Sequence, residues 1–297
     1  MHDICFVVAE ANRGYILDRI AHELGSRIAT NPIYHYEKEH LPKASSYFVM
    51  HYMLLPVIMQ DINPDVTPVT CFFTHDKGNL AHYLEPLRLC KKIIAESPEG
   101  QELLASLGIY NVEWVAECAD PEQFKPHQRT GNGSVLVCGT NYEDGRKNPE
   151  LIYAIEALLP HRQFKYLGSG WKSGFSLPYQ DYPTIYKECS VYLSASKLEG
   201  GGPNSLIEAM HSNIFPVASR TGNSEQYIVN GYNGFLFDHN ASAEHVADLI
   251  EQAYLKKPRL LPPYNDVSDT VKSYTWESYA SQVKSILTGV YYDAQAE

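Results

Sequence analysis

Residues 199–208 have the sequence Glu-Gly-Gly-Gly-Pro-Asn-Ser-Leu-Ile-Glu. They follow a strand-like run at 191–194 and lead into a helical pattern at 203–210, so they lie at the carboxyl end of a predicted strand. Open α/β sheets bind their ligands at that end. Because the three glycines carry no Cβ, the backbone there can approach a ligand closely. The stretch therefore indicates an α/β fold with a ligand site at 199–208.

The helix that begins in this stretch is predicted to bind an anion. Pro203 at the first helical position sets φ and leaves the amides of Asn204 and Ser205 at the helix N-terminus. These amides and the positive end of the helix dipole suit a diphosphate. Glu208, expected on the side opposite the apolar residues, could accept hydrogen bonds from two ribose hydroxyls, and Glu199 from sugar hydroxyls. The alternative interpretation is a glycine-rich turn flanked by two solvated glutamates.

Strand-like and helix-like segments alternate along the rest of the chain, which indicates mostly parallel sheets with helices on both faces. The polar, turn-rich stretch 120–133 interrupts this alternation and is the predicted linker. We therefore predict a short acceptor-side Rossmann-like domain at 1–124, a donor domain at 125–275, and a C-terminal helix in 276–297 that packs at the domain junction. The strand-like segments are 4–9, 46–50, 69–73, 92–96, 112–115, 135–137, 164–167, 191–194, 214–218 and 235–237, and the helix-like segments are 15–24, 84–90, 98–107, 148–158, 182–188, 203–210, 224–229, 243–254 and 276–291.

Composition excludes several other classes of protein. The 297 residues are 44% hydrophobic, as in a globular protein with a sizeable core, and the formal charge of −11 disfavours binding to DNA or to an anionic membrane surface. No apolar run approaches the roughly 18–20 residues of a transmembrane helix, and residues 4–9 read as a first strand rather than as part of a signal peptide. The six cysteines form no Cys-x-x-Cys pair, which is typical of free thiols in a reducing compartment. We expect a cytoplasmic protein.

The segment 199–208 resembles the Glu-x7-Glu donor motif of retaining glycosyltransferase family 4, which has the GT-B fold of two Rossmann-like domains facing each other across a cleft. There are two departures from the family pattern. The glutamates here are nine residues apart instead of eight because the loop has one extra glycine, and Gly139 is followed by Thr140 where the family usually has an arginine close by. Further segments that follow the family's order are Lys92–Ser97, Leu107–Val112, Asp120–Pro126, Arg146–Pro149, Gly168–Gly170, Pro216–Ser219 and Gly231–Phe235.

The resemblance implies retaining transfer of a sugar from a nucleoside diphosphate sugar to an acceptor hydroxyl, with front-face attack assisted by the leaving phosphate. The sequence contains no Asp-x-Asp motif, so we expect no metal and no cofactor; Lys147, with Arg146, would neutralise the leaving diphosphate. His75, at a strand end beside Asp76, is expected near the transferred sugar, where a general-base role suits its titration range; a surface histidine is the alternative. The predicted catalytic residues are Glu199 and His75; the predicted donor-binding residues are Gly139, Thr140, Arg146, Lys147, Gly200, Gly201, Gly202, Pro203, Asn204, Ser205 and Glu208; Arg13 and Gly14 form a predicted acceptor or phosphate loop.

Two other functions fit the same residues. One is a sugar-nucleotide epimerase-like enzyme, and the other is a non-catalytic nucleotide-sugar-binding module. Because both donor carboxylates are present, we expect transfer, with a nucleotide sugar and a hydroxyl acceptor as partners.

Overall fold

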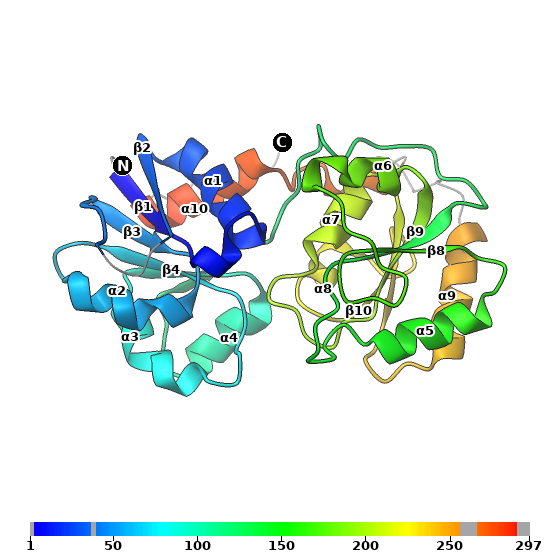
Figure 1. Cartoon of the computed structure of the whole chain (residues 1–297), viewed down its shortest axis with the longest axis horizontal. Coiled ribbons are helices and arrows are strands. Elements are labelled where there is room, and N and C mark those ends of the chain that lie inside the picture. Colours follow the sequence, from blue (N-terminus) through cyan, green and yellow to red (C-terminus); the bar gives the residue numbers. More distant parts are fainter. Residues whose placement is uncertain (1–2, 37–39, 256–265, 290–297) are drawn as a thin grey trace. The chain divides into compact units, whose positions relative to one another are not determined.

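A computed structural model of the chain describes residues 3–36, 40–255 and 266–289, and these form two compact units with one parallel β-sheet each (Figure 1). The first unit runs to residue 116 and also contains helix α10 (Trp276–Thr288); the second is Glu117–Thr275. The sequence placed the boundary later, after residue 124, inside the turn-rich stretch. Residues 290 and 291, expected in the last helix, lie outside the described residues.

The first unit has a six-stranded sheet in the order β2-β1-β3-β4-β5-β6, with every pair parallel. Its strands are nearly continuous runs of apolar residues because helices cover a parallel sheet on both faces. The chain reverses its direction of travel across the sheet between β1 and β3, which makes that position the topological switch point. The strands are β1 (Asp3–Val7), β2 (Asn31–His35), β3 (Ser46–Val49), β4 (Val69–Phe73), β5 (Lys92–Ala95) and β6 (Val112–Trp114), and the other helices are α1 (Ile16–Ile28), α2 (Leu55–Asp61), α3 (Leu84–Arg88) and α4 (Pro98–Ser106).

Strand β2 and helix α2 were not expected from the sequence. Pro32 has no backbone N–H and argues against a central strand. β2 lies at one end of the strand order, where an edge strand tolerates a proline. Helix α10 packs against α1, and Arg27 Nη2 donates to Glu277 Oε1 at 3.0 Å between them.

The second unit has a five-stranded sheet in the order β11-β10-β9-β7-β8, again parallel throughout. Here the chain reverses between β7 and β9, so the loops that follow these two strands meet at the switch point. The strands are β7 (Ser134–Cys138), β8 (Phe164–Leu167), β9 (Cys189–Ser194), β10 (Phe215–Ser219) and β11 (Phe235–Phe237), and the helices are α5 (Pro149–Leu158), α6 (Tyr182–Tyr186), α7 (Asn204–His211), α8 (Ser224–Tyr227) and α9 (Ala243–Leu255).

The predicted architecture of two Rossmann-like α/β domains is confirmed. All six cysteines are buried free thiols, as expected. None of the helices in the described ranges combines the length and the apolar character that crossing a membrane requires.

Candidate functional site

The loops after β7 and β9 carry a buried ion pair. Lys147 Nζ contacts Glu199 Oε1, and the two side chains are only 10% and 8% exposed. A Cβ added at Gly139 would lie 3.7 Å from the same lysine nitrogen, so the end of β7 is also next to the pair. The fold therefore brings together three residues that the sequence assigned to the donor site, at the edge of the sheet where α/β proteins bind ligands.

The loop after β7 is fixed by the loop after β8. Trp171 Nε1 donates to the Gly139 carbonyl oxygen at 2.7 Å. Gly168 has φ of +136°, and a Cβ there would overlap the same carbonyl group. Ser169 Oγ lies 3.5 Å from Thr140 Oγ1. Gly168 is thus explained by close backbone packing beside Gly139, and Gly170 by the same kind of packing against the Asn141 carbonyl group.

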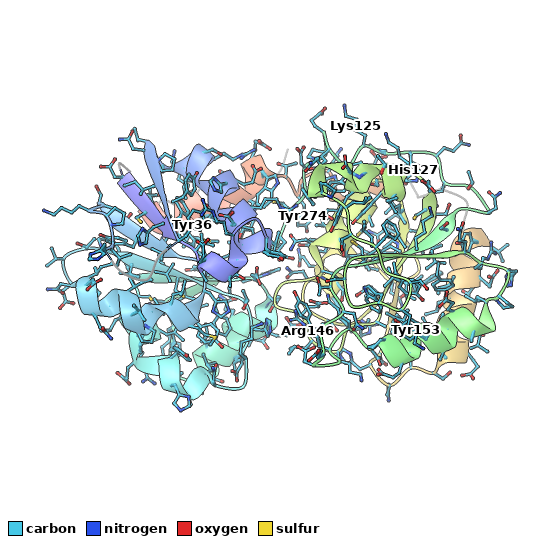
Figure 2. The ribbon with its side chains drawn as sticks, viewed as in Figure 1. Tyr36, Lys125, His127, Arg146, Tyr153 and Tyr274 are labelled. Carbon is cyan, nitrogen blue, oxygen red and sulfur yellow. The ribbon has the colours of Figure 1, made fainter. Side chains whose placement is uncertain are left out.

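Arg146 lies in the same loop as Lys147 but contacts different groups. Its guanidinium is centred 4.2 Å from the ring of Tyr142, and its Nε is 3.6 Å from Asp144 Oδ2. Figure 2 labels Arg146. The ion pair with Glu199 is therefore made by Lys147, the residue next to Arg146.

Helix α7 begins directly after residues 199–203, the glycine loop. The N-cap residue Pro203 has φ of −63° and makes no side-chain capping hydrogen bond. The hydroxyl of Ser205 points inward, 2.9 Å from the Tyr192 hydroxyl and 3.3 Å from the Cys138 carbonyl oxygen. At this helix end, the groups suited to an anion are backbone amides.

The glycine loop packs closely against protein groups of its own unit. A Cβ at Gly201 would lie 2.6 Å from Glu117 Cδ, and the Gly201 carbonyl oxygen accepts a hydrogen bond from the Asn223 amide. Asn204 Nδ2 donates to Glu117 Oε1 at 3.3 Å. Glu117 is only 4% exposed and was not predicted as a site residue. No motif around it points to this contact, because it is distant in sequence from the loop that it touches.

Glu208 is buried, with 3% of its surface exposed. Its Oε1 accepts a hydrogen bond from the Tyr179 hydroxyl at 2.7 Å, and its Oε2 accepts one from the Tyr186 hydroxyl at 3.0 Å. Burial raises the pKa of Tyr186 well above its ordinary value, so this hydroxyl stays protonated and donates a hydrogen bond to the carboxylate. The sequence expected Glu208 opposite a buried apolar face, whereas α7 packs against β9, β10 and the turn Ser268–Val271, which leaves its residues 205–211 buried.

In the first unit, the predicted loop at Arg13 and Gly14 lies at the carboxyl end of β1. The guanidinium of Arg13 is centred 4.5 Å from the ring of Tyr36, which Figure 2 labels, and 3.5 Å from a Glu10 carboxylate oxygen. Gly14 has φ of +78°, and its amide donates to Asp18 Oδ2 at 2.8 Å. This glycine therefore forms the turn that leads into α1, and the carboxylate of Asp18, in the first turn of that helix, binds the Gly14 amide.

His75 lies two residues after the end of β4 and is half-buried. The neighbouring Asp76 accepts the amides of Gly78, Asn79 and Leu80 on its Oδ1 at 2.8, 3.1 and 3.1 Å. That oxygen holds the loop after β4, and the catalytic role of His75 stays a prediction.

His51 was not predicted as a site residue, but it lies beside the switch point of the first sheet, two residues after β3. Its Nδ1 accepts the Met53 amide at 3.2 Å. Burial, with a smaller effect of the Lys77 charge, lowers the pKa of His51 from 6.5 to about 4.

This pKa predicts a loss of stability in mild acid. The unfolded chain takes up a proton near pH 6.5 and the folded chain only near pH 4, so the contribution of neutral His51 is complete above pH 6.5 and falls as the pH drops through that window. We expect His51 to account for about 2 kcal/mol of the free energy of unfolding lost between pH 7 and pH 5. Urea unfolding of wild type and His51→Gln at both pH values measures this difference, and an equal pH dependence in the two proteins would contradict it.

The chain thus has two Rossmann-like units, and in the second unit a charged pair and a helix N-terminus lie at the switch point of the sheet. The fold of two such units matches that of GT-B glycosyltransferase structures. Residues 124–267 match the family model of glycosyl transferases group 1. This match agrees with the resemblance to GT-B glycosyltransferases seen at residues 199–208.

Individual relatives agree with this assignment. A stretch of 110 residues is 34% identical to a sucrose synthase of Acidithiobacillus caldus and covers 35% of this chain but only 14% of that protein. The fold is similar to sucrose-phosphate synthase from Thermosynechococcus elongatus, with a TM-score of 0.76, 12% identity and coverage of 98% and 99% of the two chains. It is also similar to Anabaena HepE in complex with UDP and glucose, with a TM-score of 0.66, 14% identity and coverage of 97% of each chain. At these identities the solved structures establish the fold alone.

Proposed function

We propose that this protein transfers a sugar from a nucleoside diphosphate sugar to an acceptor hydroxyl, with retention of configuration and without a metal ion. The observation that carries the proposal is the buried pair of Lys147 and Glu199 beside Gly139, at the switch point of the donor unit. Burying two charges costs free energy, so such a pair at a ligand-binding edge favours a functional role.

The two members of the pair have complementary chemistry. The ammonium of Lys147 has three donors, so it can contact Glu199 and still donate to diphosphate oxygens. Glu199 has further acceptor capacity for sugar hydroxyls while Lys147 fixes its orientation. Neutralising the charge that develops on the leaving diphosphate lowers the barrier to breaking the sugar–phosphate bond. The amides at the start of α7 add to this stabilisation.

We base retention of configuration and metal independence on the groups of the protein that could stabilise the diphosphate. With Lys147 and a helix N-terminus for the diphosphate, front-face attack requires from the protein mainly positioning and electrostatic stabilisation. Glu208 would then bind the donor ribose, and His75 would lie near the transferred sugar.

Donor binding tests the proposal directly. We expect one of a panel of UDP-, GDP- and ADP-sugars to raise the melting temperature and to be hydrolysed slowly without an acceptor, in buffer containing EDTA. In Glu208→Gln, which keeps the size of the side chain, we expect about tenfold weaker binding of that nucleotide because a neutral amide oxygen accepts hydroxyl hydrogen bonds less strongly. Isothermal titration calorimetry measures the affinity. If none of the panel binds the wild type, the protein is not a nucleotide-sugar enzyme; if Glu208→Gln binds equally well, the ribose assignment is wrong.

A further inference from the structure

Two tyrosine hydroxyls hold the carboxylate of Glu208, one on each oxygen. Tyr179 donates to Oε1 at 2.7 Å and Tyr186 to Oε2 at 3.0 Å. A vicinal diol makes this same pattern with a carboxylate, since each of its two hydroxyls donates to one oxygen. The tyrosines therefore occupy two of the roughly four acceptor positions of this carboxylate, and the burial of Glu208, which is 3% exposed, restricts access to the others.

The two tyrosines differ in how firmly they are held. Tyr186 lies on α6 and is fully buried, with its hydroxyl also 3.5 Å from Cys138 Sγ and its ring 5.1 Å from that of Phe124. A side chain so enclosed has no room for another rotamer. Tyr186 thus keeps the Glu208 carboxylate in one orientation.

Tyr179 is only half-buried and lies on a single 3-10 turn, Tyr179–Asp181. Its ring packs on Phe124 and Tyr182 with centroid distances of 5.8 and 5.3 Å, and Gln123 Nε2 donates to its carbonyl oxygen at 3.1 Å. Tyr179 is therefore the less enclosed of the two tyrosines that donate to Glu208, and its hydroxyl is the one that a ligand could displace with less disturbance of the core.

We propose that Tyr179 sets the affinity of the donor site, because its hydroxyl competes with a ribose hydroxyl of the donor for Glu208 Oε1. Tyr186 acts as the positioning residue that keeps the carboxylate in place. This inference rests on the proposed function, which assigns the donor ribose to Glu208. Binding then exchanges one phenol for one ribose hydroxyl, and the affinity is reduced by the stability of the phenol contact.

The proposal predicts opposite effects for the same chemical change at the two tyrosines. Tyr179→Phe keeps the ring and removes the competitor, so we expect about fivefold tighter binding of the nucleoside diphosphate. Tyr186→Phe removes the fixed donor from Glu208, so we expect about fivefold weaker binding. Tyr166→Phe is the matched control, because Tyr166 also donates to a carboxylate of the same unit, Glu156 Oε2, at 2.8 Å. This variant should bind the nucleoside diphosphate as tightly as wild type.

The experiment is calorimetric titration of the full chain and its variants with UDP, GDP and ADP, followed by the 2′,3′-dideoxy analogue of the nucleotide that binds. The gain in Tyr179→Phe is expected to vanish with the dideoxy analogue, which has no hydroxyl to compete. An unchanged or weaker affinity of Tyr179→Phe, or a gain that persists with the dideoxy analogue, would overturn the proposal. Glu208→Gln in the same series separates the role of Tyr179 from the assignment of the donor ribose to Glu208. If Glu208→Gln binds the nucleotide more weakly and Tyr179→Phe binds it like wild type, only the role of Tyr179 is overturned. If Glu208→Gln binds as tightly as wild type, the ribose assignment is overturned, and the role of Tyr179 with it.

Discussion

Replacing Lys147 with methionine is expected to slow sugar transfer about a thousandfold and to lower the free energy of unfolding by about 3 kcal/mol. Methionine fills a similar volume but has no charge, so the nearly buried carboxylate of Glu199 loses its counter-ion. Breaking a buried pair on one side is costly because the remaining charge is neither solvated nor neutralised. The same substitution also removes the cation that we assign to the leaving diphosphate.

A second substitution separates these two effects. Lys147→Met combined with Glu199→Gln removes both charges, so we expect stability close to wild type while transfer stays slow. Urea unfolding and the rate of nucleotide release from the donor measure the two quantities independently. Lys165→Met is the control, because Lys165 pairs with the more exposed Glu188. This substitution should change neither the free energy of unfolding nor the rate of nucleotide release by much. If the double variant recovered transfer along with stability, Lys147 would have only a structural role.

The fold could be predicted from the sequence wherever apolar runs and helical spacing were long. Strands β4, β8 and β11 have the predicted bounds, and most other elements differ by a few residues at their ends. The failures have local causes. β2 contains Pro32, and proline disfavours a strand because it has no backbone N–H to donate. The strand is possible because β2 lies at the edge of the sheet.

The candidate site was predictable to the extent that it depends on parallel strands. The loops that carry Lys147 and Glu199 both follow strands, and parallel strands present their carboxyl ends at one edge of a sheet. The contact of Glu117 with Gly201 depends instead on how a distant segment crosses the glycine loop, which no local pattern records. The surroundings of Glu208 were misjudged for a related reason: the periodicity of α7 shows which residues are apolar but not that three elements enclose the helix.

The glycine loop at 199–203 has a structural requirement for glycine that extends to a second loop. Gly222 has φ of +56°, and a Cβ there would overlap the Gly201 carbonyl group. We expect Gly222→Ala to lower the free energy of unfolding by about 3–4 kcal/mol, because the left-handed backbone disfavours a Cβ and the atom that it meets is backbone. Urea unfolding measures the loss. Gly231→Ala, at φ of +81° with no atom within 4 Å of the added Cβ, should lose only about 1 kcal/mol.

Gly201→Ala provides the contrast, because its added Cβ would meet the side chain of Glu117 at 2.6 Å and its backbone is not left-handed. We expect a loss of about 2 kcal/mol, most of which Glu117→Ala restores in the double variant, since the obstructing group is then absent. The same second substitution should not rescue Gly222→Ala, whose obstacle is the Gly201 carbonyl. Equal rescue of both variants, or of neither, would show that Glu117 does not limit the space at Gly201. The extra glycine in the donor loop is thus expected to serve the fit between the loop and Glu117, in addition to any close approach by a ligand.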